Sequence, residues 1–188
     1  MKRFFAMLPI LLLLCACGSV TPAPADRFYR LQAVSGFQAK VLQGAVAMRP
    51  FRADSLYAER PIIYVDDARP RELRQYHYHL WLYPPAQTVQ SHLTASLGSA
   101  LDFTENDNAP YILDGRVLGF ERVVSGRSSK AVVALGLRLM SGGKVLLDKT
   151  FQSEQAAADD SLGAFVVAME QALGSVYAEF LADAAKVR

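Results

Sequence analysis

The sequence is almost free of cysteine. Only Cys15 and Cys17 occur among its 188 residues, both near the N-terminus. A disulfide framework and a cysteine-based metal site are therefore excluded from the rest of the chain. A dominant charge is also missing, because 20 basic residues face 18 acidic ones and no basic block occurs. This balance leaves no electrostatic footprint for nucleic acid, so we expect no nucleic-acid partner.

Catalytic signatures are missing as well. The chain has no Gly-x-Ser-x-Gly elbow, and Gly115 and Gly119 lie inside a strand pattern rather than in a phosphate-binding loop. The pair Asp66-Asp67 follows a strand, where adjacent carboxylates point to opposite sides, so we interpret it as a turn. These absences predict that the protein is not an enzyme and needs no cofactor.

Two histidines form the pattern in the sequence that most resembles part of a metal site. His77 and His79 lie two residues apart on one predicted strand, a spacing that could begin a zinc site. A third ligand would have to come from His92 or a carboxylate, and the spacing supplies no recognisable set. We therefore favour an exposed polar strand face and predict no metal.

The N-terminus carries an export signal. Lys2 and Arg3 precede an apolar run over residues 4–14, which is too short for a spanning helix. The run ends in Leu14-Cys15-Ala16-Cys17, which resembles a bacterial lipobox. Leu14 stands three positions before the cut, and Cys17 becomes the acylated first residue of the mature chain. The alternatives are a plain signal peptide that happens to contain cysteines, or a short buried helix.

This signal divides the chain into three parts. Residues 1–16 are the signal peptide, 17–26 the lipidated N-terminus and a short linker, and 27–188 one periplasmic domain. Two or three acyl chains would anchor the domain stably without a spanning segment. Gly18 replaces the aspartate that retains enterobacterial-type lipoproteins in the inner membrane, so this resemblance implies the outer membrane.

The hydrophobic pattern predicts an α+β fold. We expect a largely antiparallel sheet of about six strands with two main helices packed against it, in the order βββ(β)-α-βββ-α. Gly142-Gly143 marks a tight hairpin, and 159–161 provides cap residues for the last helix. Residues 102–109 are interpreted as a polar turn, and the strand at 130–140, apolar on both faces, as a central one. The strands are expected at 28–31, 41–48, 62–65, 72–81, 111–124, 130–140 and 144–151, and the helices at 84–101 and 162–181.

Aromatic residues gather around the predicted strand at 72–81. Most of them are expected to pack in the core or to lie half exposed. The functional alternative is a partner-contact or lipid-facing surface, because Trp and Tyr are enriched at interfaces. The candidates for partner contact are Tyr76, Tyr78, Trp81 and Tyr83.

Several motifs together resemble the ABC-type transport auxiliary lipoprotein family. The likeness runs from about Phe28 to Ala184, and the lipobox precedes it. The motifs that carry it are Gln75-Tyr76-His77-Tyr78-His79-Leu80-Trp81, Pro84-Pro85 before a helix, Ala109-Pro110-Tyr111-Ile112-Leu113-Asp114-Gly115-Arg116, Phe120-Glu121 and Ala168-Met169-Glu170-Gln171-Ala172-Leu173.

The resemblance implies a non-enzymatic role in the cell envelope. The expected partners are a periplasmic MCE-domain protein and an inner-membrane ABC permease and ATPase that move lipids or other hydrophobic molecules. Homo-oligomerisation remains open. The alternative function is a structural or assembly lipoprotein of an outer-membrane complex, without a transport role.

Overall fold

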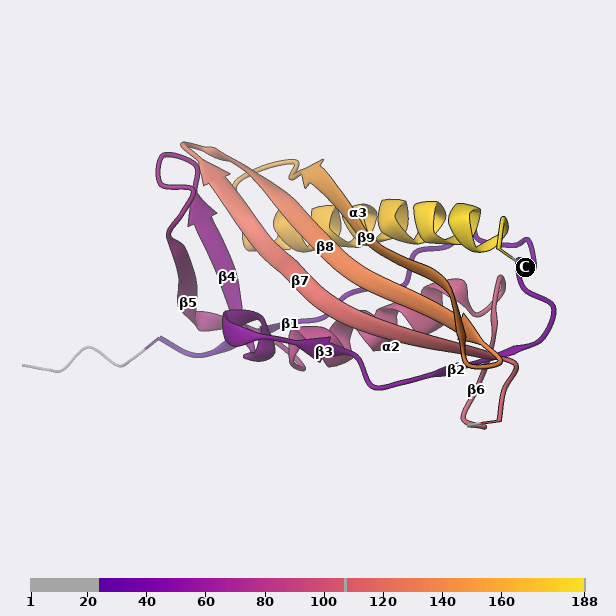
Figure 1. Cartoon of the computed structure of the whole chain (residues 1–188). Helices are drawn as coiled ribbons and strands as arrows, with labels where there is room; N and C mark the ends of the chain where they lie inside the picture. The colour runs from indigo at the N-terminus through magenta and orange to yellow at the C-terminus, as the bar shows by residue number, and fades with distance from the viewer. Residues whose placement is uncertain (1–23, 107, 188) are drawn as a thin grey trace, which may run out of the picture.

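Three long strands form one side of a nine-stranded sheet in the computed structural model, which describes residues 24–106 and 108–187 (Figure 1). They are β7 (Tyr111–Ser125), β8 (Ser128–Ser141) and β9 (Lys144–Ala156). They form an antiparallel meander, as predicted. The β8–β9 turn needs glycine, because Gly142 and Gly143 adopt φ values of 55° and 78°.

The shorter strands complete the sheet on the other edge of β7. In chain order they are β1 (Arg27–Tyr29), β2 (Ala45–Met48), β3 (Arg52–Ala53), β4 (Pro61–Asp66), β5 (Leu73–Trp81) and β6 (Asp102–Thr104). A short 3-10 helix, η2 (Ser55–Ala58), separates β3 from β4. Strands β2, β3 and β4 follow one another along β7, and each pairs with it in parallel.

The prediction of a largely antiparallel sheet of about six strands is therefore wrong, although the α+β class is confirmed. The sheet is mixed, because β1 pairs with β5 in parallel and β6 pairs with β2 in parallel. Residues 102–104 form β6 instead of the predicted polar turn. The strands in these parallel pairs lie far apart in the sequence. Local sequence patterns predict only the antiparallel pairs that a tight turn joins, so they did not predict these parallel pairs.

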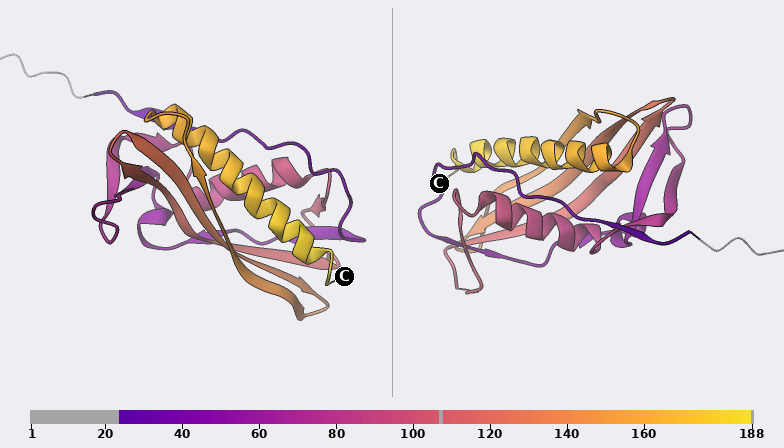
Figure 2. Two further views of the ribbon diagram at one scale, coloured as in Figure 1. Left: turned by 90° about the horizontal axis from the view of Figure 1, so that it is seen from above. Right: turned by 180° about the vertical axis from the view of Figure 1, so that it is seen from behind.

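Both helices cover the same face of the sheet (Figure 2). Helix α2 (Pro85–Leu97) begins with proline in its first turn, where the missing N–H costs no hydrogen bond. Helix α3 (Leu162–Ala184) begins after Ser161, whose side chain accepts a hydrogen bond from the N–H of Ala164 at 3.1 Å. By length and composition α3 could cross a membrane, but most of it is buried in this protein. Its apolar residues pack on β8 and β9.

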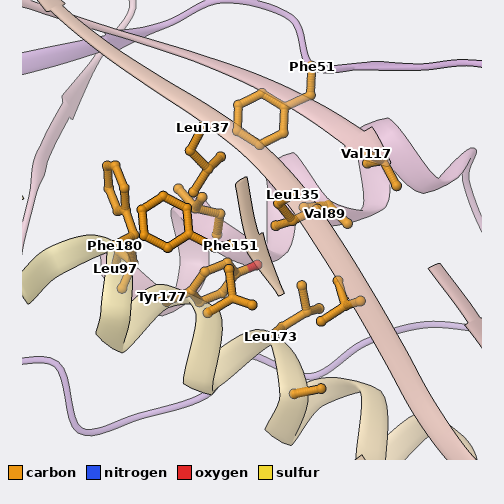
Figure 3. Close-up of a cluster of buried hydrophobic side chains, with 14 of the residues drawn as sticks. Phe51, Val89, Leu97, Val117, Leu135, Leu137, Phe151, Leu173, Tyr177 and Phe180 are labelled. Carbon is orange, nitrogen blue, oxygen red and sulfur yellow. The ribbon is translucent and has the colours of Figure 1, made fainter. Parts of the chain in front are cut away.

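One hydrophobic core lies between the sheet and the two helices. Figure 3 shows Leu135 and Leu137 of β8 facing Leu173, Tyr177 and Phe180 of α3. Gly115 of β7 admits the ring of Phe51, since a Cβ at that position would lie 2.4 Å from a ring carbon. The close approach brings the segment between β2 and β3 into the core.

The opposite face of the sheet has no helix over it among the described residues. The central position predicted for residues 130–140 is confirmed, because β8 lies between β7 and β9. The expectation that both of its faces are covered is wrong. Residues 132, 134 and 140 remain half-buried, and Leu118 of β7 and Val145 of β9 are exposed.

Candidate functional site

The edge of the sheet formed by β1 and β5 lies where the chain enters the domain. Strand β1 begins at Arg27, ten positions after Cys17 in the sequence. Leu14, Cys15, Ala16 and Cys17 lie outside the described residues, so the predicted lipidation stays a prediction. If Cys17 carries the anchor, this edge lies within roughly 36 Å of the membrane, the reach of ten extended residues.

Trp81 does not lie on a contact surface, so the prediction that it contacts a partner is wrong. Its side chain is fully buried, with 0% exposed. The indole packs against Phe120 and Phe165 at centroid distances of 4.9 and 6.0 Å. The end of β5 lies under the helices, so its last residue, Trp81, belongs to the core between the sheet and the helices.

Tyr76 joins a buried network rather than facing a partner. Its hydroxyl accepts a hydrogen bond from the guanidinium of Arg122 at 2.9 Å, and the same group donates to the carbonyl of Asp160 at 2.5 Å. The Tyr76 ring also packs on Tyr64, with centroids 4.5 Å apart. Arg122 is only 5% exposed, so it links β5, β7 and the loop before α3 from inside the protein.

Tyr78 and Tyr83 are accessible, as a contact surface requires. Their side chains are 39% and 50% exposed. An irregularity in the β4–β5 pairing places Pro61 opposite Leu80 but Ile63 opposite Gln75. The strict alternation expected for this strand is therefore broken. Tyr76 and His79, three positions apart, touch with ring centroids 5.6 Å apart.

The histidines of β5 were the residues that came nearest to a metal-binding spacing in the sequence. In residues 24–106 and 108–187, no three His, Cys, Asp or Glu side chains form a group that could hold a metal ion. His79 Nδ1 forms a hydrogen bond with the Tyr29 hydroxyl at 2.8 Å. Asp66 forms the predicted turn, because its side chain accepts from the N–H of Ala68 at 3.1 Å.

A pocket of about 270 Å³ lies beside this edge, which the sequence alone did not reveal. The segment after β1 forms one wall, the segment after β5 another, and α2 the third. The side chains around it are mostly apolar, and Leu82 and Tyr83 stand exposed at its mouth. Its lining consists of Tyr29, Arg30, Leu31, Ala33, Leu82, Tyr83, Thr88, Ser91, His92 and Ala95.

The segment after β1 crosses both helices, as Figure 2 shows. The N–H of Val34 donates to Ser96 of α2 at 3.0 Å, and the N–H of Gln32 donates to Glu170 of α3 at 2.7 Å. The Val34 side chain packs against Gly174 of α3, where an added Cβ would lie 3.3 Å away. The N-terminal segment is thus fixed to both helices along the wall of the pocket.

His92 forms the buried end of the pocket. Its Nε2 lies 2.8 Å from the carbonyl of Gln32, which can only accept, so Nε2 carries the proton. Its Nδ1 therefore accepts from the Tyr177 hydroxyl at 3.0 Å. Burial lowers the pKa of His92, against a smaller opposing effect of the Gln32 carbonyl, and burial raises the pKa of Tyr177.

We expect the free energy of unfolding to fall between about pH 7 and pH 5, partly because of His92. Its folded-state pKa lies below the ordinary 6.5, so the unfolded chain binds the proton first as the pH drops. The contribution of neutral His92 to the free energy of unfolding is fully present above the pKa of the unfolded chain. It is lost as the pH falls from that value to the pKa of the folded protein. Urea denaturation across this range should show a shallower pH dependence for His92→Gln.

His79→Gln is the matched control, because the pKa of His79 is also lowered, by slight burial and by Arg27. Its side chain lies nearer the surface, so this substitution should change the slope less than His92→Gln does. An equal pH dependence in wild type and His92→Gln would contradict the assignment of His92 as a buried neutral group.

Comparison with known proteins decides the family. A family model described as "ABC-type transport auxiliary lipoprotein component" matches residues 32–180. The chain belongs to this family. It is a family of transport auxiliary lipoproteins and not a known enzyme family.

Solved structures share the fold of this auxiliary lipoprotein. A Xanthomonas campestris protein of the family DUF330 superimposes with a TM-score of 0.71 at 18% identity, covering 83% of this chain and 93% of that one. An uncharacterized protein gives a TM-score of 0.70 at 16% identity, covering 85% and 99%. No curated protein matches the sequence at a significant level.

Proposed function

We propose that this auxiliary lipoprotein works in an MCE/ABC-type system that moves lipids or other hydrophobic molecules across the cell envelope. Acylated Cys17 holds the domain on the periplasmic face of the outer membrane. The domain contacts a periplasmic MCE-domain protein, which connects it to an inner-membrane ABC permease and ATPase. Family membership across residues 32–180 is the observation that carries this proposal.

The structure offers a suitable contact surface at the β1–β5 edge. Tyr78 and Tyr83 provide large exposed rings there, and tyrosine is among the residues that contribute most to binding energy in protein interfaces. The edge lies at the entry of the chain into the domain, next to the proposed anchor. We therefore assign Tyr78 to the contact with the MCE-domain protein.

Substitution of Tyr78 by aspartate tests this assignment. A charge at the centre of an interface should lower recovery of the MCE-domain protein at least tenfold in an affinity purification from envelopes. Val145→Asp is the matched control, because Val145 is 54% exposed and lies near the opposite end of the sheet. Equal recovery with both variants would contradict the assignment of this surface.

A further inference from the structure

The pocket between the segment after β1 and helix α2 has the size of a hydrocarbon-chain site. An apolar cavity of about 150 Å³ holds a benzene molecule, so by that scale this pocket of about 270 Å³ takes roughly ten carbons. It opens to solvent at Leu82 and Tyr83 and ends at His92. One chain can enter while its polar end stays outside.

Three polar side chains of the wall, those of Thr88, His92 and Tyr29, already have hydrogen-bond partners, whereas the Ser91 side chain is exposed. The Thr88 hydroxyl donates to the carbonyl of Tyr83 at 2.9 Å, and both ring nitrogens of His92 are engaged. The Tyr29 hydroxyl is bound to His79. A polar ligand would gain few hydrogen bonds inside the pocket and would lose its hydration, whereas a hydrocarbon chain loses nothing.

Arg30, at the mouth of the pocket, determines which charge the head group of a ligand should carry. It is exposed and is the only residue in the lining that carries a full charge. Its guanidinium makes no ion pair with any acidic side chain in the described part of the chain. A guanidinium pairs well with carboxylate or phosphate, so this position favours an anionic head group.

We propose that the pocket binds one hydrocarbon chain of an anionic amphiphile, with the carboxylate or phosphate head at Arg30. The acyl groups expected on Cys17 are a poor match, because their ester and amide links leave no negative charge beside the chains. The inference rests on the proposed transport function for its biological meaning, and names the class of molecule that the domain handles. The binding site itself requires no transporter component.

Trp81 provides an intrinsic reporter for this site. It is the only tryptophan of the chain and directly precedes Leu82 at the mouth. Alkyl carboxylates of increasing length, each with a bromine on a carbon near the carboxylate, are titrated into the acylated protein held in amphipol. Bound bromine should quench the indole fluorescence. Affinity should rise about fourfold per methylene and level off at roughly ten carbons, when the pocket is filled.

Two variants separate the chain from the head group. Ala95→Phe places a ring at the exposed edge of the pocket and should weaken binding of every chain length at least tenfold. Arg30→Gln should weaken binding of the carboxylates at least fivefold and leave brominated alcohols of equal length unchanged. Arg127→Gln, which alters an exposed arginine in the β7–β8 turn, is the control and should change neither.

The proposal would be overturned by a lack of saturable quenching, by quenching that does not depend on chain length, or by equal binding of the carboxylates to Arg30→Gln and wild type. Quenching that appears only in Cys17→Ser protein would show that the protein's own acyl chain fills the pocket, which also overturns it. The titration contains no MCE-domain protein, so a negative titration does not contradict the proposed transport partnership. Failure to recover the MCE-domain protein likewise does not contradict the proposed pocket.

Discussion

Replacing Cys17 by serine is expected to abolish acylation and tight membrane association of the protein. The thiol is the acceptor that the lipobox predicts, and serine cannot take its place in the thioether. The remaining apolar run at residues 4–14 is too short to span a bilayer. Metabolic labelling with a radioactive fatty acid should give no labelled protein, and alkaline carbonate should extract the variant from membranes.

Cys15→Ser is the matched control for this experiment. It alters the other cysteine, two positions earlier, and keeps Leu14, Ala16 and Cys17 in place. Acyl labelling and resistance to carbonate should stay at the wild-type level. Full labelling of the Cys17→Ser protein, or loss of labelling in Cys15→Ser, would show that the lipobox has been assigned to the wrong residue.

Replacing Trp81 by alanine is expected to lower the free energy of unfolding by about 3–5 kcal/mol, the range for large aromatic residues cut to alanine in a core. The indole is fully buried between Phe120 of β7 and Phe165 of α3. Its removal leaves a cavity at the junction of the sheet with the last helix. Urea denaturation followed by far-UV circular dichroism measures this loss.

Two further variants distinguish packing from other effects. The Trp81 Nε1 group is buried without a hydrogen-bond partner among the described residues, so Trp81→Phe removes a poorly satisfied N–H and should cost much less than alanine. Tyr83→Ala, at a half-exposed position, should change stability by less than about 1 kcal/mol. A larger loss with Tyr83→Ala than with Trp81→Ala would contradict the burial described here.

Local signals in the sequence were sufficient for the antiparallel half of the sheet and for both helices. Gly142 and Gly143 mark the turn between β8 and β9, and Ser161 caps α3 as predicted. The parallel pairings of β2, β3 and β4 with β7 depend on where distant segments pack, and no turn residue encodes them. The prediction therefore failed for the sheet topology and for the short strands β3 and β6, and it held for the longer strands and both helices.

The same limit applies to the candidate site. Tyr78 and Tyr83 are exposed, as the contact-surface alternative requires, while Trp81 was misplaced because the irregular pairing of β5 breaks the two-residue period. Arg122 was missed, although it shares an inward position with Phe120 in the alternation of β7. A charged residue at an inward position of a strand indicates a buried side chain with hydrogen-bond partners. The sequence contains this signal at Arg122.

The measurement that tests the central claim most directly is affinity purification of the detergent-solubilised wild-type protein from envelopes, with mass spectrometry of the proteins that accompany it. Assignment to an MCE/ABC-type transport system predicts recovery of an MCE-domain protein together with the permease or ATPase. Recovery of only outer-membrane barrel or peptidoglycan-associated proteins would contradict that assignment and favour an assembly lipoprotein.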